Sequence, residues 1–258
     1  MKRVILLVAF GASSVQGRSA LQNFDAMVRE RLAGLPVRWA YTSLLLRERL
    51  TQARQKSDSV VKALNRLTFE RFDEVAVQPL QTVGREHAAV CAAAGEVAAG
   101  GGIDCRVGMP LLTTAADVQA VARAIVRHLP EQRNPAEDVV FMGHGARYAA
   151  VALYEDLACA VRNLDEHVHI GAMNGATGLE KILSALSSNR VWLMPLLSVV
   201  GRHALQDMAG EHKASWRSRI EADGRQCVPV LKGIAEYDGF AEIWLGHLED
   251  LVQSFTMG

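Results

Sequence analysis

The feature of this sequence that most limits its fold is a regular alternation of short apolar runs with longer amphipathic stretches. Strands buried on both faces of a parallel sheet read as unbroken Val, Ile and Leu runs, whereas covering helices repeat their apolar residues at helical spacing. The expected strands are Val4–Phe10, Val37–Tyr41, Val75–Leu80, Cys105–Val107, Val139–Met142, Val168–Ala172, Val191–Leu196 and Val228–Leu231. The expected helices lie near residues 18–34, 44–69, 85–99, 115–129, 147–163, 177–187, 202–222 and 237–255. This order predicts an α/β fold of parallel sheets flanked by helices.

The two halves of the chain resemble each other. The first strand of each half runs into a glycine-containing turn, at residues 9–13 and 142–146. The third strand of each half leads into Pro-Leu and then into Gly-Arg and His-Ala, at residues 79–88 and 195–204. Internal repetition predicts two similar α/β lobes with a cleft between them. We expect lobes at residues 1–130 and 136–236, with a C-terminal helix at about 237–258 packing back on the first lobe.

Composition excludes several classes of function. The 28 basic and 28 acidic residues balance, so a nucleic-acid partner has no electrostatic support. No apolar run reaches the roughly 18 residues that cross a bilayer, and we interpret Val4–Phe10 as a buried strand and not as a signal peptide. The four cysteines include no C-x-x-C pair and are interpreted as buried apolar residues in a reducing compartment. We therefore expect a cytoplasmic protein.

Two histidines follow strands of the second half. His144 stands between Gly143 and Gly145, directly after one strand, and His203 comes shortly after another. Ligands of parallel sheets bind beyond the carboxyl ends of the strands, so both imidazoles are expected at one edge of one sheet. Neutral imidazole binds divalent metals and accepts protons near neutral pH. The alternative is that His144 only caps its turn.

A nucleotide-dependent enzyme is the least favoured reading. The Gly143-x-Gly145 pair after a strand is similar to the start of a dinucleotide-binding motif, but the third glycine position holds Tyr148, which is too large for close helix–strand packing. The phosphate-binding pattern G-x-x-x-x-G-K-[ST] does not occur in the sequence.

Residues 139–146 and 193–216 together resemble the anaerobic (class II) sirohydrochlorin cobaltochelatases of cobalamin biosynthesis, and residues 6–13 and 41–43 are also similar to theirs. The resemblance implies a lyase with two α/β lobes that inserts Co²⁺ into the tetrapyrrole sirohydrochlorin without ATP. It implies a tetrapyrrole and a divalent metal as partners, no organic cofactor, no nucleic acid and no membrane, and it leaves homo-oligomerisation open. Imidazole binds Ni²⁺, Fe²⁺ and Zn²⁺ as well as Co²⁺, so the ligand type does not choose the metal.

The resemblance also implies roles for individual residues. His144 and His203 fall on the family's metal-site histidines, with His144 as the catalytic residue that receives protons. Asn174 occupies the third metal position, where the family usually has a glutamate; an amide is a poorer ligand and cannot act as a base. The expected substrate-binding residues are Phe10, Gly11, Ser13, Ser14, Gln81, Gly143, Leu197 and Val199. Gln81 stands where the family commonly has a histidine.

The change at Asn174 keeps other readings open. Glu86, Glu155 or Glu180 is a candidate replacement carboxylate. A second reading is a non-catalytic protein that holds a tetrapyrrole or a metal in the same site. A third is a ferrochelatase or nickel chelatase for the same macrocycle.

Overall fold

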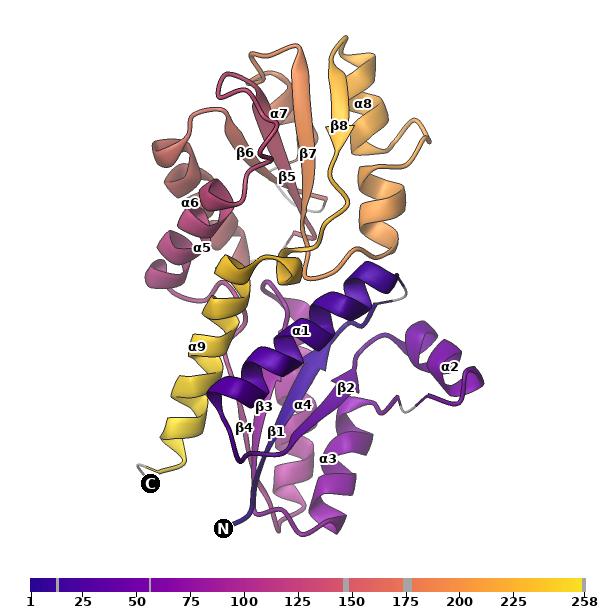
Figure 1. Cartoon of the computed structure of the whole chain (residues 1–258), viewed down its shortest axis with the longest axis vertical. Helices are drawn as coiled ribbons and strands as arrows, with labels where there is room; N and C mark the ends of the chain where they lie inside the picture. Colours follow the sequence, from indigo (N-terminus) through magenta and orange to yellow (C-terminus); the bar gives the residue numbers. More distant parts are fainter. Residues whose placement is uncertain (13, 56, 146–148, 174–177, 257–258) are drawn as a thin grey trace. The chain divides into compact units, whose positions relative to one another are not determined.

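A computed structural model describes residues 1–12, 14–55, 57–145, 149–173 and 178–256 (Figure 1). The chain divides into two compact units: residues 1–111 with 241–258 form the first, and residues 112–240 form the second. Within the described residues, no helix is long and apolar enough to cross a membrane.

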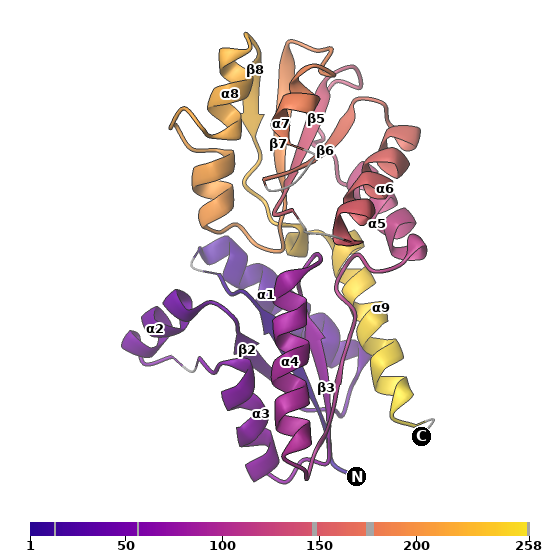
Figure 2. The same cartoon turned by 180° about the vertical axis from the view of Figure 1, so that it is seen from behind.

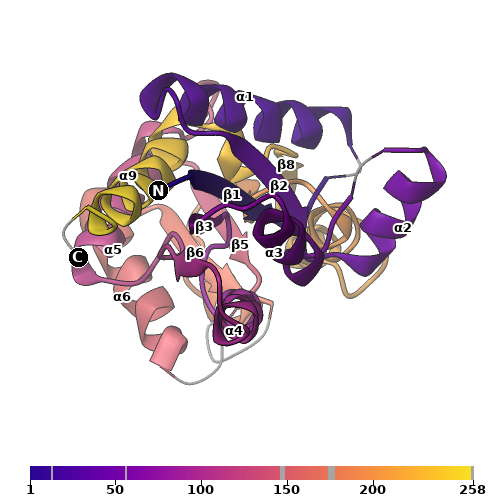
Figure 3. The same cartoon turned by 90° about the horizontal axis from the view of Figure 1, so that it is seen from below.

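The first unit is built on a parallel sheet of four strands. In chain order its elements are β1 (Arg3–Ala9), α1 (Val15–Arg31), β2 (Val37–Tyr41), α2 (Leu44–Gln52), α3 (Val60–Phe69), β3 (Glu74–Pro79), α4 (Arg85–Ala99), β4 (Asp104–Val107) and, from the end of the chain, α9 (Asp238–Ser254). The strand order is β2-β1-β3-β4. Helices α3 and α4 cover one face, where alternate β1 residues meet them in a buried core, and α1 and α9 cover the other face (Figure 3).

The second unit repeats this plan. Its elements are α5 (Ala115–Arg127), β5 (Asp138–Gly143), α6 (Ala149–Leu164), β6 (Val168–Ala172), α7 (Leu179–Leu183), β7 (Arg190–Leu196), the π-helical turn η1 (His203–Met208), α8 (Trp216–Ala222), β8 (Gln226–Pro229) and the short 3₁₀ turn η2 (Ile234–Glu236). The sheet order is β6-β5-β7-β8, and its strands are also parallel. Helices α7 and α8 pack with η1 in one core, while α5 and α6 lie together on the other face (Figures 1 and 2). The predicted α/β class with two parallel, helix-flanked sheets is confirmed.

The boundary between the units differs from the expected one. It falls between Leu111 and Leu112, whereas the sequence placed the end of the first lobe at residue 130. The physical reason is that α5 packs against α6 and so groups with the second unit.

Two expected helices are each broken in two. Within the stretch 44–69, α2 ends at Gln52. The backbone of Arg54 then adopts a positive φ of 55°, which a helix does not permit. The chain restarts as α3 after Ser59, whose side chain accepts a hydrogen bond from the Lys62 amide. The stretch 202–222 is divided in the same way, because Ser215 caps a new helix, α8.

Candidate functional site

The ends of β5 and β7 place the two histidines. These strands are neighbours in the second sheet, with Gly143 paired to Leu196 in register, so the loops that leave them start at the same edge. His144 follows Gly143 directly, and Gly145 has a φ of +88°, which favours glycine. His203 is the first residue of η1. The two imidazole rings lie 5.0 Å apart between centroids and are inclined by 80°.

This spacing suits a shared metal ion. A ligating imidazole nitrogen lies about 2.1 Å from its ion and about 1.1 Å from the centroid of its own ring. When the nitrogen–metal–nitrogen angle lies between a right angle and the tetrahedral angle, the two ring centroids are therefore roughly 4.5 to 5.2 Å apart. The measured 5.0 Å falls inside that interval. The structure therefore brings together the two histidines that the sequence selected.

The protonation of His144 also suits metal binding. Burial lowers the pKa of the His144 imidazole from its ordinary value, and the neighbouring His203 lowers it further. A lowered pKa favours the neutral ring, which has a free lone pair for a metal or a proton.

His203 has a carboxylate partner that sequence reasoning missed. Its Nδ1 lies 2.6 Å from the Oδ2 of Asp207, four residues further along η1. Both residues sit in a stretch that was expected to be helical, so the four-residue spacing was a usable signal. This contact makes Asp207 part of the candidate site.

A glycine is required at position 143 because the ring of Tyr154 packs closely against it. A Cβ at this position would lie 2.6 Å from the ring of Tyr154, a buried residue of α6. Burial raises the pKa of this phenol to about 12, so it stays protonated. Gly143 thus holds β5 close to α6 immediately before His144.

The remaining residues expected in the second unit are less informative. Asn174 lies outside the described residues. Leu197 is half-buried and packs on the core of α7 and α8, and Val199 is only 7% exposed, which leaves little of its surface for a ligand. In the described part of the chain, no three His, Cys, Asp or Glu side chains are arranged to hold a metal.

Two of the expected replacement carboxylates, those of Glu155 and Glu180, have other surroundings in the structure. The carboxylate of Glu180 forms an ion pair with Arg219, whose hydrogen bond lowers the pKa of that carboxyl. Glu155 is exposed on α6. Glu86 belongs to α4 of the first unit.

In the first unit, the turn after β1 carries an apolar surface. Phe10, Val15, Leu44 and Leu45 are all exposed. The backbone of the β2–α2 turn lies beside Phe10, because the Ser43 amide donates to the Phe10 carbonyl at 3.3 Å. The sequence selected Phe10 but missed Val15, Leu44 and Leu45, whose exposure is set by tertiary packing. We name this surface, made by Phe10, Val15, Leu44 and Leu45, the apolar strand-end surface.

Gly11 fixes this turn. It adopts a φ of +99°, and a Cβ there would lie 1.8 Å from the Leu46 side chain. Leu46 is buried on this glycine and so anchors the start of α2. Ser14, which was expected to bind substrate, instead caps α1 by accepting from the Gly17 amide at 3.1 Å. Ser13 lies outside the described residues.

Several buried polar atoms near this surface lack a partner within the described part of the chain. They are Thr42 Oγ1, Arg47 Nε and both amide atoms of Gln81. Buried polar groups are nearly always satisfied by protein, water or ligand. Gln81 is only 5% exposed, whereas Arg47 is partly exposed, so of the two Arg47 is the candidate for contact with a polar ligand.

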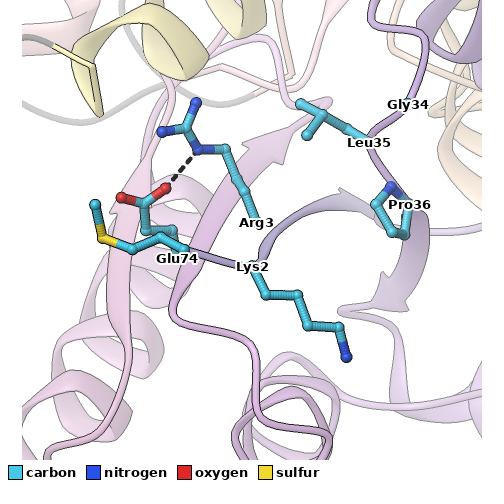
Figure 4. Close-up of a pocket in the computed structure, with 7 residues that line it drawn as sticks. Lys2, Arg3, Gly34, Leu35, Pro36 and Glu74 are labelled. Atoms are coloured by element: carbon cyan, nitrogen blue, oxygen red, sulfur yellow. Dashed lines mark hydrogen bonds and ion pairs between the residues drawn. The ribbon is translucent and has the colours of Figure 1, made fainter.

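A surface hollow at the opposite end of the first sheet has no comparable chemistry. It is lined by the starts of β1 and β3 and by the loop before β2 (Figure 4). Its Arg3 and Glu74 form an ion pair of 2.6 Å, so they neutralise each other. None of its lining residues is a histidine or a cysteine.

Comparison with known proteins places this geometry in a family. The model of a family described as cobalt chelatase (CbiK) matches residues 3–253. The sirohydrochlorin cobaltochelatase CbiKC of Nitratidesulfovibrio vulgaris is 50% identical over 98% of this chain and 92% of its own length. The sirohydrochlorin cobaltochelatase of Salmonella typhimurium is 30% identical over 96% of both chains.

Solved structures agree on the fold. SirB from Bacillus subtilis, solved with Fe³⁺, matches with a TM-score of 0.69 at 14% identity over 99% of this chain and 98% of its own. CbiX, described as the terminal enzyme for biosynthesis of siroheme in denitrifying bacteria, matches with a TM-score of 0.62 at 14% identity over 96% and 99%. The family model spans nearly the whole sequence, and a curated relative shares half of its residues. The chain therefore belongs to the cobalt chelatase (CbiK) family.

Proposed function

We propose that this protein is a sirohydrochlorin cobaltochelatase, which inserts Co²⁺ into sirohydrochlorin without ATP or an organic cofactor. The observation that carries the proposal is the His144–His203 pair, whose rings are 5.0 Å apart at the edge of the second sheet. Its support from relatives is the 50% identity to a protein of that name over nearly the full chain.

The two imidazoles have complementary tasks in this reaction. Insertion requires an ion that has lost part of its water shell and a macrocycle that has lost its pyrrole protons. Two imidazole ligands leave other positions of the ion open to the ring nitrogens of the substrate. The lowered pKa of His144 keeps its nitrogen available, either to the ion or to a departing proton. Asn174 is proposed as the third, weaker ligand.

The first unit is proposed to bind the macrocycle itself. The apolar strand-end surface suits the flat apolar face of a tetrapyrrole. The partly exposed Arg47 guanidinium suits a carboxylate on its rim, because guanidinium N–H groups donate to carboxylate oxygens.

The choice of metal is a separate matter from the ligand set. Imidazole and amide ligands accept Ni²⁺, Fe²⁺ and Zn²⁺ as well as Co²⁺. Cobalt is proposed here because the two curated relatives described above are named for it.

Anaerobic absorbance spectroscopy with sirohydrochlorin and Co²⁺, measured against the rate without protein, tests the proposal. We expect acceleration by the wild type and its loss in His144→Ala and in His203→Ala. His167→Ala serves as a control, because His167 lies at the opposite end of the same sheet, beside Asp138. Wild-type turnover in either strand-end variant would show that the pair is not the insertion site. A chromophore shift without acceleration would instead establish a tetrapyrrole-binding protein.

A further inference from the structure

The carboxylate of Asp207 contacts His203, and the proposed metal insertion assigns this carboxylate no role. Its Oδ2 lies 2.6 Å from His203 Nδ1, which is short and typical of a charge-assisted hydrogen bond. The neighbouring Arg202 donates to Gln206, at 2.9 Å. Asp207 thus pairs with the imidazole of His203, while the neighbouring Arg202 pairs with Gln206.

This contact determines which nitrogen of His203 carries the hydrogen. A carboxylate accepts hydrogen bonds and cannot donate them, so Nδ1 is the donor. In the neutral ring the lone pair then lies on Nε2. We propose that Asp207 is a positioning residue, which fixes the tautomer and ring orientation of His203 so that Nε2 is presented to the incoming Co²⁺; the inference rests on the proposed function for the identity of the metal. Histidine ligands of metals are commonly held by a carboxylate or carbonyl in this way.

The first unit provides an internal comparison. After the corresponding strand, His87 and Cys91 show the same four-residue spacing on α4. There the Nε2 of His87 lies 3.0 Å from the Gly108 carbonyl, while the Cys91 sulfur lies 3.7 Å from Nδ1. A carbonyl accepts, so the hydrogen is on Nε2 and the lone pair is on Nδ1. The two halves thus favour opposite tautomers, and only the second has a carboxylate on Nδ1.

A purely structural role for Asp207 would give a different experimental result from a role in positioning His203. An exposed pair four residues apart on a helix is a common surface feature, and the side chains of His203 and Asp207 are 46% and 43% exposed. Removing such a pair would change stability alone. Removing a positioning residue would change the affinity for the metal and leave binding of the macrocycle unchanged.

The test uses the whole 258-residue chain and three variants. Co²⁺ is titrated into wild type, Asp207→Asn, Asp207→Glu and the control Glu221→Gln. Binding is followed by the visible absorption of the ion and by the shifted exchangeable ring N–H signal in proton NMR. Loss of an orienting partner is expected to weaken Co²⁺ binding by about 10- to 100-fold in Asp207→Asn. The same variant should have an altered N–H signal, a raised KM for Co²⁺ and an unchanged KM for sirohydrochlorin. Asp207→Glu should recover part of the affinity, because it keeps a carboxylate.

Glu221→Gln is the matched control. Glu221 also pairs four residues away, with Arg217 at 2.9 Å, and its side chain is 41% exposed. The Glu221→Gln protein should bind Co²⁺ with the same affinity as the wild type. Wild-type affinity in Asp207→Asn, or equal weakening in Glu221→Gln, overturns the inference. Weaker binding in Asp207→Asn alone supports it even if the wild type fails to accelerate insertion, a result that would overturn only the proposed function. A wild type that binds no Co²⁺ overturns both.

Discussion

Asp138, at the amino end of β5, gives a stability prediction that can be worked out from the structure. The residue is 1% exposed. Its Oδ2 accepts from the backbone amides of Ser187 and Ser188 at 2.8 and 2.7 Å. Its Oδ1 lies 3.0 Å from His169 Nε2 and 3.4 Å from His167 Nδ1. Burial alone would raise the pKa of this carboxyl, but the hydrogen bonds from His169, Ser188 and Ser187 outweigh it and lower the pKa to about 2.

The sign and size of the effect follow from linkage. The folded state holds the carboxylate with a pKa of about 2, against an ordinary value of 3.8. That difference corresponds to about 2.4 kcal/mol of stability. The contribution is fully present above about pH 4 and is lost as the pH falls towards 2. Asp138→Asn should therefore lower the free energy of unfolding of the second unit by about 2 kcal/mol at pH 7, and the deficit should shrink below pH 4.

Urea unfolding at a series of pH values checks this prediction, with hydrogen exchange at the Ser187 and Ser188 amides as a local readout. Asp223→Asn is the control, because Asp223 is an exposed residue that pairs with Arg225 in the same unit, and such pairs contribute only about 0 to 1 kcal/mol. A deficit below about 0.5 kcal/mol at pH 7, or one that stays constant down to pH 3, would refute the reasoning.

Two further predictions concern a glycine and a thiol. Gly11→Ala should destabilise the first unit by about 2 kcal/mol or more in urea titrations, because it combines backbone strain with overlap on the Leu46 side chain; Gly34→Ala, with a φ of +92° but nothing within 4 Å, should cost less, and equal losses would contradict the role of the contact. The expectation that all four cysteines are buried is wrong, since Cys91 and Cys159 are exposed and only Cys227 is fully buried among them. Burial raises the pKa of the Cys227 thiol to about 12, so iodoacetamide at pH 8 should alkylate the exposed Cys159 and leave Cys227 unmodified in mass spectra of digested protein. Rapid labelling of Cys227 in the folded protein would show that the thiol is not shielded.

The order of strands and helices could be read from the sequence because buried parallel strands leave a clear apolar signature. The approach of His144 to His203 could be expected as well, since neighbouring parallel strands end at one edge. The break after Gln52 could not, because the apolar residues on both sides keep helical spacing while the interruption comes from a positive φ at Arg54. The exposure of Leu44 and Leu45 had no local signal either, since it depends on what the rest of the unit leaves uncovered.

The grouping of residues 241–258 with the first unit has a consequence for how the protein is made. The second unit is one continuous stretch of chain and can be completed as soon as it leaves the ribosome. The first unit begins earlier but has to wait for the last segment, which supplies Trp244 against Phe24 of α1. Until then, the face of the first sheet that α9 covers lacks its partner, so the part that starts to emerge first is finished last. A nascent chain released before this segment would carry an exposed apolar face, which is the kind of surface that chaperones bind.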